Sequence, residues 1–181
     1  THPIFLPFYS LLVYTPVIAK YNISTLTISA VWIVFMYISL PLVYFIYIRK
    51  SKLAYPSIDE RKSIYRAYSL VNFGFALVSI FLMQEYITFF LAATFLHLLM
   101  LFFAFIELKV SWHSAVWSFL LGTGLMIHYN YQFSDFGYLL EIASITILVS
   151  VVRWKANAHT LLQLVMGLAI GFLASTPILF F

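Results

Sequence analysis

Long apolar runs alternate with short polar interruptions along the whole chain. The apolar runs cover about 3–19, 25–48, 66–84, 86–107, 113–129, 136–152 and 160–181. A helix that crosses a bilayer needs roughly 17–25 apolar residues, so these runs are long enough, or nearly so, to span a membrane. The pattern predicts an all-α, polytopic membrane helical bundle with about six to seven transmembrane segments, forming a single transmembrane domain over residues 1–181.

Composition agrees with a membrane setting. The chain is 64% hydrophobic and only 9% charged, whereas a soluble domain carries about 25% charged residues. A water-facing surface needs more charge than this, and nothing in the composition indicates a nucleic-acid partner. The chain has no cysteine, so it gives no indication of redox compartment. It opens at Thr1 without a basic segment of the kind that begins a cleavable signal.

The basic residues are unevenly placed. If all seven runs cross the membrane, the polar loops at about 49–66, 108–113 and 153–159 emerge on one face. Nine of the ten Lys and Arg residues then lie on that face, and only Lys20 lies opposite. The positive-inside rule would make the basic face cytoplasmic. Cations that bind a ligand would also gather there, so the orientation stays open.

The polar interruption at 153–163 contains candidate chemistry. If the last helix begins near residue 158, His159 and Gln163 share a helix face, and the Gln163 amide can orient the ring of His159. Arg153 in the preceding turn, beside a helix N-terminus, would complete an anion site. The alternative is a snorkelling Arg and Lys with an interfacial His.

A second interruption, Lys109-x-Ser111-x-His113, brings a cation, a hydroxyl and an imidazole to one region. These groups suit a phosphate, although Ser111 would also serve as a helix N-cap. His97 lies in the middle of an apolar run, where a packed, hydrogen-bonded histidine is the simpler interpretation. The histidines have no carboxylate partners at metal-ligand spacing, so no metal site is predicted. No glycine-rich phosphate or dinucleotide motif is present, and no cofactor is expected.

Two further patterns concern packing. Gly167-x-x-x-Gly171 in the last run predicts a close helix contact. Trp112, Trp117 and Trp154 lie near the basic face and suggest an interfacial aromatic belt.

The polar motifs resemble the signatures of the type 2 phosphatidic acid phosphatase superfamily. Arg153-x5-His159 followed by Gln163 is similar to the third signature, Ser-Arg-x5-His-x3-Asp. Ser111-x-His113 is similar to the second, Pro-Ser-Gly-His. The opening His-Pro-x3-Pro and the order of the motifs look like a compact bacterial branch of this superfamily, which implies the bacterial inner membrane.

The resemblance implies a fold and a mechanism. His159 would attack phosphorus to give a phospho-histidine, and His113 would protonate the leaving oxygen. Arg153 and Ser111 would hold phosphate oxygens, without a metal or another cofactor. The partner would be a membrane lipid with a phosphate headgroup.

Departures from the family pattern leave two functions open. The first signature, Lys-x6-Arg-Pro, is absent, and Arg61, Lys62 or Arg66 are candidates to replace its cations. Gln163 stands in place of Asp and cannot stabilise an imidazolium by charge; Trp112 stands in place of Gly. We therefore expect either a lipid phosphatase, weakened or not, or an inactive phosphatase-like subunit that binds lipid or scaffolds a larger membrane complex.

Overall fold

The computed structural model describes residues 57–82, 87–131 and 136–180, and every element in these ranges is helical. Five of the predicted apolar runs correspond to α-helices, and the runs at 3–19 and 25–48 lie outside the described residues. The elements are α3 (Ile58–Leu82), α4 (Ile87–Phe105), α5 (Trp112–Tyr131), α6 (Gly137–Lys155) and α7 (Leu161–Ser175), followed by the 3-10 helix η4 (Thr176–Phe180).

Four stretches of helix are long and apolar enough to cross a membrane. They are Ile58–Phe81, Ile87–Phe105, Gly137–Lys155 and Leu161–Leu179. The described part of the chain is therefore all-helical, and its four apolar helices are those of a multi-pass membrane protein. The total of six to seven segments stays a prediction, because residues 1–56 are not among those described.

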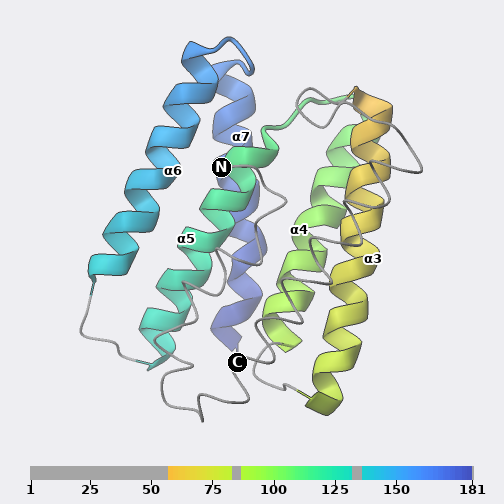
Figure 1. Ribbon diagram of the computed structural model, residues 1–181, viewed down its shortest axis with the longest axis vertical. Helices are drawn as coiled ribbons and strands as arrows, with labels where there is room; N and C mark the ends of the chain where they lie inside the picture. The colour runs from red at the N-terminus through yellow and green to blue at the C-terminus, as the bar shows by residue number, and fades with distance from the viewer. Residues whose placement is uncertain (1–56, 83–86, 132–135, 181) are drawn as a thin grey trace.

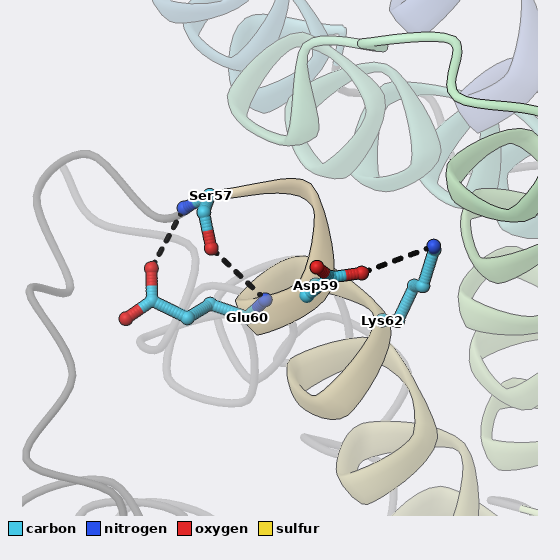
Figure 2. A network of polar contacts seen from close by, with 4 residues as sticks. All are labelled: Ser57, Asp59, Glu60 and Lys62. Atoms are coloured by element: carbon cyan, nitrogen blue, oxygen red, sulfur yellow. Dashed lines mark hydrogen bonds and ion pairs between the residues drawn. The ribbon is translucent and has the colours of Figure 1, made fainter.

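Helix α3 begins about eight residues earlier than predicted because a capping box starts it. The backbone N–H of Ser57 donates to Glu60 Oε2 at 2.7 Å, and the N–H of Glu60 donates to Ser57 Oγ at 3.3 Å (Figure 2). This reciprocal pair satisfies donors that a helix start leaves open. Arg61, Lys62 and Arg66 were expected in a loop, but they lie on the first turns of α3.

Successive helices run in opposite directions, so their polar ends coincide. In Figure 1 the start of α3, the link from α4 to α5 and the turn from α6 to α7 all lie at the upper end of the bundle. We call this the basic end. It carries every Lys and Arg of the described ranges: Arg61, Lys62, Arg66, Lys109, Arg153 and Lys155.

Helix α5 forms the centre of the bundle and packs mainly on α7. A Cβ at Gly167 would lie 2.6 Å from the carbonyl oxygen of Ser111, and one at Gly171 would overlap the carbonyl of Ala115. The predicted close contact of this glycine pair is confirmed. It holds two backbones together, and the N–H of Ser111 donates to the carbonyl of Gln163 at 3.1 Å.

The predicted aromatic belt is wrong for two of its three tryptophans. Trp112 and Trp117 are 7% and 4% exposed, because α5 is enclosed by other helices. Trp154 on α6 is 52% exposed and can lie at a membrane interface.

Candidate functional site

His159 lies in the turn between α6 and α7, immediately before the N-cap residue Thr160. Helix α7 begins at Leu161, so His159 precedes the helix and does not lie on it, as a start near residue 158 would have required. The residue is only 6% exposed. Its Nδ1 is 3.1 Å from Gln163 Oε1, so the expected contact between the ring and the amide is present.

A capping box fixes the amide that holds this ring. The N–H of Thr160 donates to Gln163 Oε1 at 3.2 Å, and the N–H of Gln163 donates to Thr160 Oγ1 at 3.3 Å. The atom facing His159 is therefore an oxygen, which can only accept. Nδ1 must be the donor, and the neutral ring carries its lone pair on Nε2.

The role of Thr160 was missed in the sequence, although the pattern Thr-x-x-Gln before an apolar run is a recognisable start signal.

Burial and charge keep the ring of His159 neutral. Burial lowers its pKa, the hydrogen bond to Gln163 opposes this, and the positive charges of Arg61, Arg153 and Lys109 lower it further. Three cations from separate polar segments thus act on one imidazole. Near neutral pH, this environment favours a lone pair on Nε2 rather than an imidazolium.

The structure separates the three candidate cations of α3. Arg61 acts on His159, and its Nη1 donates to the carbonyl of Val110 at 3.2 Å. Lys62 and Arg66 instead lie over the ring of Phe105 at the end of α4. Only Arg61 of the three is therefore placed among the groups whose charges act on the imidazole.

Arg153 is directed to the site by the way α6 ends. Asn157 adopts the left-handed conformation, with φ of 51°, which Asn tolerates better than most residues. The N–H of Ala158 donates to the carbonyl of Arg153 at 3.1 Å, and the N–H of Asn157 to that of Trp154 at 2.9 Å. These two bonds form a Schellman turn, which reverses the chain between Arg153 and His159. Nε of Arg153 is buried and has no hydrogen-bond partner.

Ser111 caps the start of helix α5, which is the structural alternative given for it from the sequence. It is fully buried, and its Oγ accepts from the N–H of Ser114 at 3.4 Å and from Ser114 Oγ at 3.1 Å. It is thus an N-cap of α5, linked to the site through its backbone bond to Gln163. Lys109 is exposed just before it, and His113 is half-buried in the first turn of α5.

The ring of Trp112 turns toward α3 and α4. It packs edge-on against Tyr65, Tyr68 and His97, with ring centroids 5.7, 5.4 and 6.3 Å away. Trp112 therefore contributes to an aromatic cluster with Tyr65, Tyr68 and His97.

The charges that act on His159 suit an anion. Between described residues the only ion pair is Lys62–Asp59, which does not involve the three cations that act on His159. Within 57–82, 87–131 and 136–180, no group of three His, Cys, Asp or Glu side chains could hold a metal ion. Cations around a neutral imidazole can bind a phosphate and present a nucleophile to it.

No family model, no curated protein and no solved structure matches the chain. The resemblance to the type 2 phosphatidic acid phosphatases therefore stays a prediction that rests on the signature residues.

Proposed function

We propose that the protein is a membrane lipid phosphatase of the type 2 phosphatidic acid phosphatase kind. Its substrate is a phosphate monoester or pyrophosphate on a membrane lipid. One observation carries the proposal: a buried imidazole, oriented through Nδ1 by Gln163, is acted on by the charges of Arg61, Arg153 and Lys109. These charges favour the neutral ring, which is the form that can attack phosphorus.

The proposed reaction has two steps. The Nε2 lone pair of His159 attacks phosphorus, the P–N bond forms, and the P–O bond to the lipid breaks. The leaving oxygen takes a proton from His113. His113 then deprotonates a water molecule, whose oxygen attacks phosphorus. The P–N bond breaks, inorganic phosphate leaves, and both histidines return to their starting states.

The cations supply electrostatic stabilisation in both steps. Arg61, Arg153 and Lys109 can bind the phosphate oxygens, where negative charge gathers in the transition state. Gln163 keeps Nδ1 protonated and the ring in place. It adds no negative charge, so the imidazolium-like state is less stabilised than it would be beside a carboxylate.

The surroundings suit a lipid. Leu161 and Leu162, directly after the His159 turn, are 62% and 68% exposed. In a membrane-spanning helix these side chains face acyl chains. A lipid can thus approach from the bilayer with its headgroup at the basic end.

The test is phosphate release by purified protein from a lipid phosphate monoester and a lipid pyrophosphate, with a metal chelator present. We expect release by the wild type and at least about a 10³-fold loss in His159→Ala, as when a catalytic nucleophile is removed. His97→Leu is the matched control, because it alters another buried histidine and should keep the activity. Unchanged release by His159→Ala would overturn the assignment of the nucleophile.

Two observations favour a second candidate, the inactive lipid-binding subunit. Ser111 uses its oxygen as a helix cap, and Gln163 is uncharged. If this candidate holds, the wild type is inert on the whole lipid panel and co-purifies stably with a partner protein. It still binds lipid phosphate, and Arg153→Gln weakens that binding.

A further inference from the structure

Two basic side chains of α3 share one aromatic ring, away from the cations that act on His159. Lys62 and Arg66 are one helical turn apart. The Nζ of Lys62 is 5.7 Å from the ring centroid of Phe105, and the guanidinium carbon of Arg66 is 5.2 Å from it. Cations at this distance are attracted by the negative face of the ring. Phe105 is 52% exposed and Arg66 is exposed as well, whereas the Lys62 side chain is 21% exposed, so the ring and Arg66 lie at the surface. We call these three residues the aromatic corner.

The two cations of the corner differ in their acidic neighbours. Lys62 is paired with Asp59 at 3.1 Å; its side chain is 21% exposed and that of Asp59 is 91% exposed. Arg66 is exposed and has no carboxylate partner within the described residues. Glu107, two residues beyond Phe105, is exposed and forms no ion pair with Lys62 or Arg66 in the described part of the chain. The guanidinium of Arg66 thus remains able to pair with an external anion.

An apolar surface runs from the corner toward the opposite end of the bundle. Exposed side chains recur at helical spacing on both helices of the α3–α4 pair: Leu70, Phe73, Leu77 and Phe81 on α3, and Leu91, Phe95, Leu98 and Phe102 on α4. At 1.5 Å per residue, the stretch from Arg66 to Phe81 is about 22 Å long. One leaflet of a bilayer contributes about 15 Å of hydrocarbon, so a full acyl chain can lie along it.

We propose that the aromatic corner binds the phosphodiester headgroup of an anionic bilayer phospholipid, with the acyl chains along the exposed α3–α4 surface. The planar guanidinium of Arg66 suits paired contacts to phosphate oxygens. Phe105 holds both cations at the level of the boundary between water and hydrocarbon. The bound lipid is not a substrate of the His159 site, so this inference does not depend on the proposed function.

The experiment measures retained lipid by native mass spectrometry of the full chain in detergent. The protein is titrated with phosphatidylglycerol and, separately, with phosphatidylcholine, which has the same phosphate but no net charge. We expect selective retention of phosphatidylglycerol and about a fivefold weaker affinity in Arg66→Gln, since one cation near a membrane surface contributes about 1 kcal/mol. Lys155→Gln, which removes an exposed cation of α6 at the same end, should retain the lipid.

A second variant isolates the ring. Phe105→Leu stays apolar but loses the cation-binding face, and its affinity should fall about threefold. Equal retention by the wild type and Arg66→Gln would overturn the proposal, as would equal retention of phosphatidylcholine. If millimolar inorganic phosphate displaced the bound lipid as effectively as added lipid does, the proposed contact with the acyl chains would be excluded. His159→Ala should keep its lipid; loss in that variant would place the lipid at the other site.

Discussion

Two buried histidines of this bundle each place Nδ1 against a carbonyl oxygen, but the groups that surround the two rings differ. His159 is 6% exposed and His97 is fully buried. Each ring approaches a carbonyl oxygen through Nδ1, that of the Gln163 amide at 3.1 Å and that of the Ala93 backbone at 2.7 Å. The ring of His97, however, stacks on Tyr68 with centroids 5.1 Å apart, and its Nε2 is buried without a hydrogen-bond partner. His159 has cations near it instead.

The difference shows that burial and an oriented ring do not make a histidine chemically useful. His97 lies inside a membrane-spanning helix, in an aromatic cluster that a charged ligand could enter only at a high desolvation cost. His159 lies beyond the end of a span, where cations from three segments act on it. Position relative to the water boundary, together with the neighbouring charges, distinguishes the candidate nucleophile from the packing residue.

The largest effect is expected from removing the side chain that orients His159. Gln163→Leu loses the acceptor for Nδ1 and half of the capping box, so kcat for phosphate release should fall by roughly 10²–10⁴, as when a histidine loses its orienting partner. Gln163→Glu, which keeps an acceptor oxygen, should be much less impaired. If Gln163→Leu released phosphate as fast as the wild type, the side-chain acceptor would not contribute to catalysis. His159 would then not differ in this respect from His97, whose partner is a backbone carbonyl.

The second effect concerns stability and belongs to His97. His97→Ala removes a stacked ring from a fully buried position, so the free energy of unfolding should fall by about 2–4 kcal/mol. Unfolding in detergent, followed by circular dichroism, measures it. His97→Leu fills most of the volume and should lose less. If His97→Ala were as stable as the wild type while losing all phosphatase activity, the packing role of His97 would be wrong.

A smaller effect is expected at the helix cap that supports the His159 site. Thr160→Ala removes the side-chain acceptor for the N–H of Gln163 and should lower stability by about 1 kcal/mol. Thr160→Ser keeps the oxygen and should behave like the wild type. The same unfolding measurement applies, and equal losses in both variants would show that the hydroxyl does not contribute.

The smallest effect is a shift in pH dependence. The positive charge of Lys109 helps to lower the pKa of His159, so Lys109→Gln should let that pKa rise toward its ordinary value. The neutral, nucleophilic ring then appears at higher pH, and the acidic limb of kcat/KM should move to higher pH. Lys155→Gln is the matched control and should leave the profile in place. Movement toward lower pH would contradict the assigned electrostatics.

Much of the helical framework could be predicted from the sequence. The apolar runs locate α4, α5 and α6 to within a few residues, because spans in a bilayer need long uninterrupted hydrophobic stretches. The run at 160–181 also locates the start of α7 at Leu161. The start of α3 was misplaced because the capping box at Ser57 was overlooked, and the capping box at Thr160 was not recognised either. Both follow a Ser/Thr-x-x-Glu/Gln pattern that is visible in the sequence.

Which residues form the site was harder to predict from the sequence. Arg61, Lys62 and Arg66 are close in sequence, but each residue of a helix is rotated by about 100° from the last. Which cation reaches His159 therefore depends on how α3 is turned against α4, and that is decided by packing. The direction of the Trp112 ring has the same origin, since it follows from the space between Tyr65 and His97.

The central helix has a consequence for how the protein enters the membrane. Helix α5 is almost wholly enclosed, and it is not among the stretches apolar enough to span a bilayer by composition. Its serines and glycines suit contact with α7 better than contact with lipid. A segment with so little preference for hydrocarbon should be retained in the bilayer together with a neighbouring helix rather than alone. Biogenesis of the bundle would then depend on cooperative insertion, and a chain truncated after α5 should leave this segment poorly integrated.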